Sequence, residues 1–182
     1  MTVSPDSSDR LSFISPSPEK TRQVASVLSR CWAQTSHGRS GLQILLRGEL
    51  GVGKTVFVKG LAMGLGLGSD HISSPTFVLA NQYACEDGRG LHHVDFYRLE
   101  SFDELESMGF FELGGPDVVL AIEWGDRFPE ALSKDRLEIH LARRGSSGEE
   151  ERAIEVQATG PESQLSLNAW KKNWPEKPLS SH

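Results

Sequence analysis

The sequence predicts a three-layer α/β domain with a mixed, mainly parallel central sheet, helices on its faces and a C-terminal β-meander. Two near-continuous apolar runs, residues 42–46 and 118–122, are typical of strands that a sheet buries on both faces. Helical patterns precede and follow the first run. Two alternating segments, residues 136–142 and 152–158, indicate half-buried strands near the end of the chain.

Composition predicts one globular domain in 182 residues, which we divide into a polar N-terminal extension (1–11), the main domain (12–160) and a weakly helical tail (161–182). The polar start and the lack of a long apolar run lead us to expect no membrane span and no secretory signal, hence a cytoplasmic protein. Cys31 and Cys85 are isolated, which argues against zinc or a disulfide framework. A net charge of −6 argues against a large nucleic-acid footprint.

The first helix is signalled by Ser17 as a cap and Pro18 as the first helical residue. We expect it to run to about Gln34, because apolar residues then recur at helical spacing: Val24, Val27, Leu28, Cys31 and Trp32. A loop at 35–41 leads to the strand at 42–46.

A phosphate-binding loop follows that strand. The eight residues fit G-x-x-x-x-G-K-[ST], in which glycines let successive backbone N–H groups face a phosphate: Gly48, Glu49, Leu50, Gly51, Val52, Gly53, Lys54 and Thr55. The helix predicted from Val56 to about Leu65 adds the positive end of its dipole. We expect Lys54 to be an exposed loop residue that reaches the β- and γ-phosphates, and Thr55 to be a ligand of Mg²⁺. A Gly-rich turn with an incidental lysine is the alternative.

The middle of the chain predicts a turn at 73–76, a strand at 77–83, a hairpin turn at 86–90 and a returning strand at 91–97. A short helix at 102–108 starts near Ser101 or Asp103 and stops at Gly109. The second apolar strand ends at Glu123, and a helical turn is expected at 126–132.

Two acidic residues, Asp95 and Glu123, stand at the ends of predicted strands, where open α/β sheets bind ligands. A P-loop protein needs one acid to hold magnesium and another to orient the attacking water. The alternatives are an edge charge for Glu123 and a turn-forming role for Asp95. His92 and His93 are adjacent and so face opposite sides of a strand, and we interpret both as structural.

The bound base is predicted to be adenine, because the Asn-Lys-x-Asp signature of guanine recognition is absent. Arg143 and Arg144 resemble lid arginines of a kinase, but acidic residues follow them closely. A solvated hairpin tip is the favoured interpretation of that pair.

Five ordered blocks together resemble the TsaE (YjeE) family, the ATPase subunit of bacterial tRNA threonylcarbamoyladenosine biosynthesis. The blocks are the phosphate loop, residues 74–77 (SPTF), 95–99 (DFYRL), 104–109 (ELESMG) and Glu123-Trp124, and the resemblance covers about residues 18–152. It implies that Lys54, Asp95 and Glu123 are catalytic, and that Thr55 and Glu123 bind Mg²⁺. It also implies that ATP contacts the eight loop residues with Thr76 and Trp124, and that residues 74–77 form a switch-like loop.

The sequence departs from the family pattern at Val56, where a hydroxyl residue is usual, and at Gly125, where proline is frequent. The resemblance implies an ATPase that is weak alone and is stimulated by a transferase subunit (TsaD) and a scaffold subunit (TsaB), with tRNA contacted only indirectly. A small-molecule kinase is the alternative function, and a non-hydrolysing nucleotide-binding module is a third.

Overall fold

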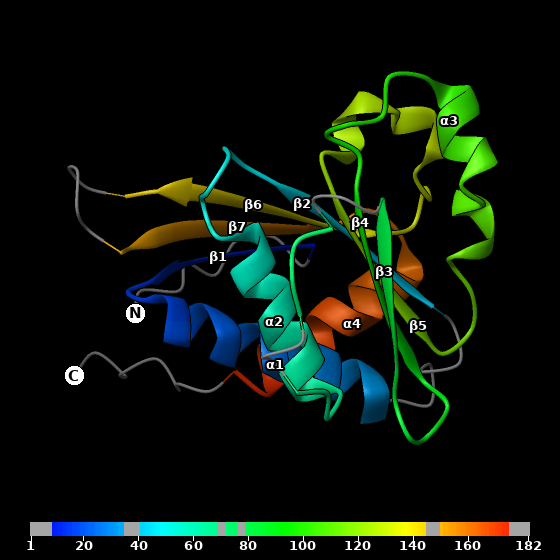
Figure 1. Ribbon diagram of the computed structural model, residues 1–182. Helices are drawn as coiled ribbons and strands as arrows, with labels where there is room; N and C mark the ends of the chain where they lie inside the picture. Colours follow the sequence, from blue (N-terminus) through cyan, green and yellow to red (C-terminus); the bar gives the residue numbers. More distant parts are fainter. Residues whose placement is uncertain (1–8, 35–40, 69–71, 76–78, 145–149, 175–182) are drawn as a thin grey trace, which may run out of the picture.

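The computed structural model describes residues 9–34, 41–68, 72–75, 79–144 and 150–174. Its strands are β1 (Arg10–Ser15), β2 (Leu42–Arg47), β3 (Ala80–Ala84), β4 (Gly90–Asp95), β5 (Val118–Glu123), β6 (Leu137–Arg143) and β7 (Arg152–Ala158). They form one sheet in the order β1-β7-β6-β2-β5-β4-β3 (Figure 1). The neighbours β6, β2, β5 and β4 are parallel, whereas β1, β7 and β3 pair antiparallel. The predicted mixed sheet with a mainly parallel centre is confirmed.

Helices cover both faces of the sheet. On one face lie α1 (Pro18–Gln34), α2 (Lys54–Gly64) and α4 (Pro161–Lys172), and on the other lie α3 (Phe102–Ser107) and the 3-10 turns η2 (Phe110–Glu112), η3 (Gly125–Arg127) and η4 (Pro129–Ala131) (Figure 1). The side chains of the central strands point alternately into two separate hydrophobic cores, one on each face of the sheet. Ile44 and Ala121 belong to the first core, beneath α1, α2 and α4, and Leu45 and Ile122 belong to the second. The three predicted layers are therefore present.

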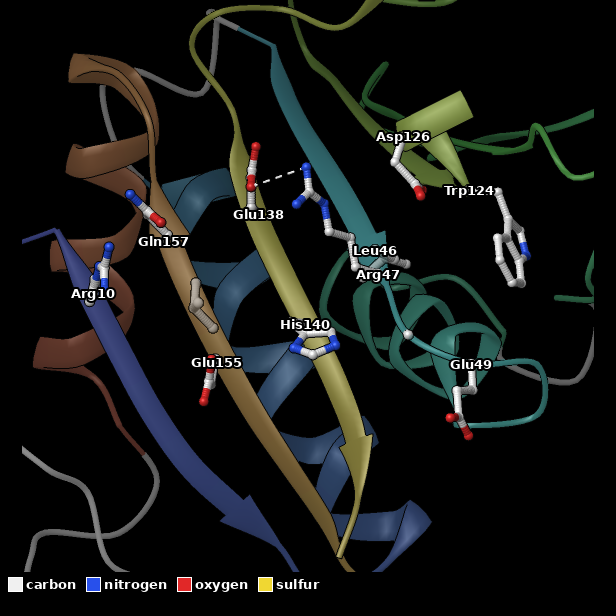
Figure 2. A pocket seen from close by; sticks show the side chains of 12 residues that line it. Arg10, Leu46, Arg47, Glu49, Trp124, Asp126, Glu138, His140, Glu155 and Gln157 are labelled. Carbon is white, nitrogen blue, oxygen red and sulfur yellow. Dashed lines mark ion pairs between the residues drawn. The ribbon is translucent and has the colours of Figure 1, made fainter. Parts of the chain in front are cut away.

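The layer on the α3 side is incomplete, because it leaves the β1-β7-β6 part of the sheet uncovered. Ile139 and Val156 point into the first core, while His140 and Glu155, their neighbours in sequence, are exposed on the open face (Figure 2). This is the alternation expected of strands with one buried and one solvated face. Among the described helices, none combines the length and the apolar character that a membrane crossing requires.

Several local signals in the sequence are confirmed. Helix α1 begins at Pro18, and the Ser17 hydroxyl accepts a hydrogen bond from the Lys20 N–H (3.2 Å). Helix α3 is capped by Ser101, which accepts from the Glu104 N–H (3.2 Å), and Gly109 ends the segment in the left-handed region. These signals act within one turn of the chain, so they need no tertiary contact to be read.

Both ends of the chain differ from the sequence-based expectation. Residues 1–8 lie outside the described part of the chain, but Arg10 and Leu11 belong to β1, a strand that the periodicity did not indicate. It pairs with β7, which is distant in sequence. At the other end, α4 is a packed helix, because Leu167 and Trp170 are fully buried in the first core. Both segments thus complete the domain rather than extend from it.

Some boundaries also shift. Helix α2 begins at Lys54 and not at Val56, and β4 ends at Asp95 and not at Tyr97. Strand β3 begins at Ala80. The predicted strand start at 77 and Thr76 lie outside the described residues.

Candidate active site

The phosphate loop connects β2 to α2 through backbone conformations that only glycine adopts easily. Gly48 has φ 135° and Gly53 has φ 112°. A Cβ on Gly48 would lie 2.3 Å from the Leu141 carbonyl oxygen, so any side chain there would strike β6. Gly53 precedes the first turn of α2, whose free N–H groups then open towards the loop. The sequence pattern is thus folded as an anion-binding loop requires.

Lys54 is buried, with 4% of its surface exposed, so the expectation of an exposed side chain is wrong. Its ammonium group donates to the carbonyl oxygens of Gly48 (2.9 Å) and Glu49 (3.1 Å). It also lies 4.5 Å from the centroid of the Trp124 ring, a cation–π contact. Lys54 is the first residue of α2, and its side chain folds back over the loop between the carbonyls, which satisfy its donors, and the Trp124 ring.

Glu123 is the last residue of β5, and its carboxylate interacts with three side chains. Its Oε1 accepts hydrogen bonds from the Thr55 hydroxyl (3.2 Å) and from His93 Nε2 (2.9 Å), and its Oε2 lies 3.9 Å from Lys54 Nζ. Hydroxyl and carboxylate oxygens are ligands that magnesium prefers. The described residues contain no group of three or more His, Cys, Asp or Glu side chains at a metal-binding spacing. Thr55 and Glu123, with their two adjacent oxygen groups, are the residues of this site that could hold Mg²⁺, together with phosphate oxygens.

Asp95 ends β4 directly beside Glu123, because the two are register partners in the parallel β4–β5 pair. Its Oδ1 accepts a hydrogen bond from the Tyr97 N–H (2.9 Å). Burial raises the pKa of the Asp95 carboxyl above its usual range. That N–H bond opposes the rise, the Glu123 carboxylate adds to it, and the positive charge of Lys54 lowers the pKa. A carboxyl in this setting is suited to accept a proton.

A cavity of about 540 Å³ brings most of the predicted site residues together. It is lined by five residues of the phosphate loop, by both strand-end acids and by the tryptophan that follows the second acid: Leu50, Gly51, Gly53, Lys54, Thr55, Asp95, Glu123 and Trp124. Gly48 and Glu49 lie outside it, Val52 is buried, and Thr76 lies outside the described residues. Ser74, Tyr97 and Arg98 also line it. Ser74 lies in the predicted turn and the other two lie in the DFYRL block, but no individual role is predicted for any of the three from the sequence.

A larger hollow, about 590 Å³, lies on the open face of the sheet (Figure 2). Its charged lining is mostly acidic, with Glu49, Asp126, Glu138 and Glu155 against Arg10 and Arg47, and Arg47 lies 3.4 Å from Glu138. Carboxylates repel phosphates. The smaller cavity, which contains Lys54 and the start of α2, is therefore the better nucleotide site.

Trp124 and Gly125 form a tight turn after β5. Trp124 has φ 58°, a rare conformation for a bulky residue, and its ring lies 5.2 Å from that of Tyr97. A Cβ on Gly125 would lie 2.6 Å from Leu45 Cδ1. A glycine at position 125 therefore matches the close packing of Leu45 beneath the turn. Strained turns of this kind are concentrated at functional sites.

Two arginines connect the β6–β7 pair to the phosphate loop. Arg143 Nη2 donates to the Gly51 carbonyl oxygen (3.1 Å), and Arg152 Nε donates to that of Val52 (2.7 Å). The sequence predicts a solvated hairpin tip at Arg143 and Arg144, and both residues are exposed. The contact of Arg143 with the phosphate loop is an addition to that prediction, and residues 145–149 lie outside the described part of the chain.

The fold and the loop define a P-loop nucleotide-binding protein. The family profile described as "Threonylcarbamoyl adenosine biosynthesis protein TsaE" matches residues 15–154. The chain belongs to the TsaE family.

Named relatives and a solved structure agree with this assignment. A Bacillus subtilis protein named tRNA threonylcarbamoyladenosine biosynthesis protein TsaE is 35% identical over 152 residues, which is 83% of this chain and 87% of the relative. A Streptomyces coelicolor protein of the same name is 39% identical over 125 residues, 67% of this chain and 83% of the relative. The crystal structure of Bacillus subtilis YdiB superposes with a TM-score of 0.67 at 28% identity, covering 95% of this chain and 98% of that one.

Proposed function

We propose that this protein is a Mg²⁺-dependent ATP hydrolase that acts in the biosynthesis of threonylcarbamoyladenosine in tRNA. One observation carries the proposal: a single cavity joins the phosphate loop to two strand-end carboxylates, Asp95 and Glu123. The names of its relatives supply the process. ATP is favoured over GTP because the sequence lacks the guanine signature.

In this proposal each residue has one task. The N–H groups of the loop and of the start of α2 bind the phosphates. Lys54 exchanges its carbonyl contacts for the β- and γ-phosphates, and Trp124 keeps its ammonium group in place through the ring contact. Asp95 orients the attacking water and accepts its proton, which its raised pKa favours.

Thr55 and Glu123 are the residues that would hold Mg²⁺. The ion would neutralise charge on the β- and γ-phosphates. The fit rests on the two oxygen ligands, which already lie 3.2 Å apart, and on the lysine beside them. The hydroxyl of Thr55 must turn from Glu123 towards the ion, while the Glu123 carboxylate stays where His93 holds it.

Partners belong to the same proposal. We expect the transferase subunit TsaD and the scaffold subunit TsaB to dock in the cytoplasm and to raise a low intrinsic rate, while tRNA is bound only indirectly. Arg98 is exposed, lines the cavity and already interacts with another group of the protein. A partner that redirects Arg98 towards the γ-phosphate, or supplies another arginine, could raise the rate by about 10³- to 10⁵-fold.

The first test is Lys54→Ala. Calorimetric titration with ATP and Mg²⁺ should show a loss of affinity of about 100-fold or more, because a charge-assisted contact to phosphate disappears. Lys59→Ala, in the same helix but outside the cavity, is the matched control. Wild-type affinity and turnover in a folded Lys54→Ala protein would refute the assignment of the loop.

The second test separates hydrolysis from transfer. Phosphate release is measured with ATP alone, with the purified transferase and scaffold subunits, and with small-molecule acceptors. We expect the subunits to stimulate release of free phosphate. Stimulation by an acceptor that becomes phosphorylated would instead establish a kinase.

A further inference from the structure

His93 is a fully buried side chain at the base of the candidate site. It lies on β4 between Leu91 and Asp95, on the face of the strand that points towards the first core and α2. Its Nε2 atom is 2.9 Å from Glu123 Oε1. The sequence predicts a structural role for His93, because adjacent histidines face opposite sides of a strand. The contact with Glu123 depends on the register of β4 against β5, which the sequence of one strand does not contain.

The hydrogen-bonding state of the ring follows from its surroundings. In the part of the chain that the structure describes, Nδ1 is buried and has no hydrogen-bond partner. A neutral ring with its proton on Nε2 leaves Nδ1 as a bare acceptor, which costs less than burying a charged ring with an unpaired donor. The tautomer that fits is the one that donates to Glu123.

The other two partners of Glu123, Lys54 and Thr55, are also expected to bind the nucleotide or its metal ion. Lys54 and Thr55 both contact the carboxylate, but in the proposed function Lys54 turns to phosphate and Thr55 to the metal ion. His93 lines no part of the cavity and cannot reach the nucleotide. It can therefore keep its bond to Oε1 while the other two contacts are exchanged.

We propose that His93 is a positioning residue that fixes the Glu123 carboxylate for magnesium. The inference rests on the proposed function, because it gives Glu123 the role of a metal ligand. Histidine here acts as an outer partner of an oxygen ligand, not as a ligand itself. Outer partners of this kind typically contribute 10- to 100-fold to metal affinity or activity.

A purely structural role makes a different prediction. If His93 only filled space, His93→Leu would keep its volume, remove the unpaired nitrogen and leave magnesium dependence unchanged. If His93 positions Glu123, the same variant stays folded but loses much of the benefit that magnesium gives to nucleotide binding. Thermal stability and magnesium dependence therefore separate the two roles.

The experiment compares His93→Leu and His93→Gln with His92→Leu. The Gln amide nitrogen can replace Nε2 as a donor, whereas His92 faces the other way and contacts the Leu113 carbonyl oxygen (2.6 Å). Binding of a non-hydrolysable ATP analogue is measured by calorimetry with and without Mg²⁺, beside the melting temperature. We expect the enhancement by Mg²⁺ to fall about 10- to 100-fold in His93→Leu, to recover in His93→Gln and to persist in His92→Leu.

The possible failures are distinguishable. An unchanged magnesium enhancement in folded His93→Leu overturns the role of His93 but leaves the proposed function standing. A wild-type protein that binds the analogue equally well with and without Mg²⁺ overturns the proposed function first. If His93→Leu does not fold, His93→Gln against His93→Asn decides, because the shorter Asn amide cannot reach Glu123. Equal magnesium enhancement in those two variants overturns the inference.

Discussion

Glu123 shows how a buried charge is tolerated next to a site that must bind anions. Only 4% of the residue is exposed, and an isolated carboxylate in such a position would cost several kcal/mol. Two hydrogen bonds to Oε1 and the ammonium group of Lys54 near Oε2 offset that cost. The same arrangement keeps Lys54 over the loop, because its charge is shared between Glu123 and the carbonyls of Gly48 and Glu49.

Asp95 has less compensation than Glu123, because in the described part of the chain its carboxylate accepts one hydrogen bond, from the Tyr97 N–H, and this difference leads to a prediction about stability. Burial raises the pKa of its carboxyl, so the folded protein binds this proton more tightly than the unfolded chain. Stability therefore decreases as the pH rises through the raised pKa. Asp95→Asn removes the charge and keeps an oxygen for the Tyr97 N–H. We predict a higher melting temperature at pH 7, with a gain that shrinks as the pH is lowered towards the ordinary aspartate pKa of 3.8.

Hydrolysis should respond in the opposite direction. Asp95→Asn is expected to lower phosphate release by about 100-fold or more, because an amide cannot accept the proton of water. Asp126→Asn is the control, because Asp126 is exposed. It should change neither the melting temperature, measured by thermal scans between pH 4.5 and pH 7.5, nor the rate of phosphate release. A lower melting temperature for Asp95→Asn at pH 7 would contradict the assigned cost of the carboxylate.

At the scale of elements, the β6–β7 pair supports the phosphate loop from outside. Arg143 and Arg152 are register partners, so two positive charges stand directly opposite each other across the strands. Like charges in this position are normally unfavourable. Here each guanidinium donates to a different loop carbonyl, that of Gly51 or that of Val52, so the strand pair is bonded to the phosphate loop at two consecutive residues.

Removing one of these contacts should weaken nucleotide binding without unfolding the protein. We predict that Arg143→Ala lowers ATP affinity by about fivefold, the equivalent of one hydrogen bond of about 1 kcal/mol. Arg144→Ala is the matched control, because the contact described for Arg144 is made by its backbone N–H, to the Glu151 carbonyl oxygen. Calorimetry on both variants is the measurement, and equal losses would point to the general charge of this hairpin instead of the Gly51 contact.

Elements encoded by neighbouring residues could be predicted from the sequence, and elements that depend on distant contacts could not. Pro18 and Ser101 signal helices because capping is local. The burial of Lys54 was not predictable, because it depends on where the loop carbonyls and Trp124 lie in space. Likewise, the bond between His93 and Glu123 requires the register of β4 against β5.

At the scale of the whole molecule, the two ends of the described chain close one side of the first core. Strand β1 extends the sheet beyond β7, and α4 packs against α1 beneath it (Figure 1). The sequence did not indicate these roles, because β1 is an edge strand that pairs with β7, which is distant in sequence, and α4 has few apolar residues. Their stability comes from tertiary contacts, chiefly those of Phe13, Leu167 and Trp170.

Trp170 provides the test of whether α4 belongs to the domain. The side chain is fully buried, its Nε1 donates to the Val24 carbonyl oxygen of α1 (2.9 Å), and its ring lies 6.2 Å from that of Phe57 in α2. We predict that Trp170→Ala lowers the free energy of unfolding by about 3–5 kcal/mol, because it leaves a large cavity. Trp170→Phe should cost less, since it keeps an aromatic ring and loses the hydrogen bond.

Leu165→Ala is the matched control on the same helix, because Leu165 is exposed and should change the free energy of unfolding by no more than about 0.5 kcal/mol. Urea denaturation of the three variants measures the difference. If Trp170→Ala costs no more than Leu165→Ala, residues 161–172 are a dispensable tail. If the large difference is found, α4 supports the P-loop helix through Phe57, and truncation at residue 160 should reduce nucleotide binding by unfolding the domain.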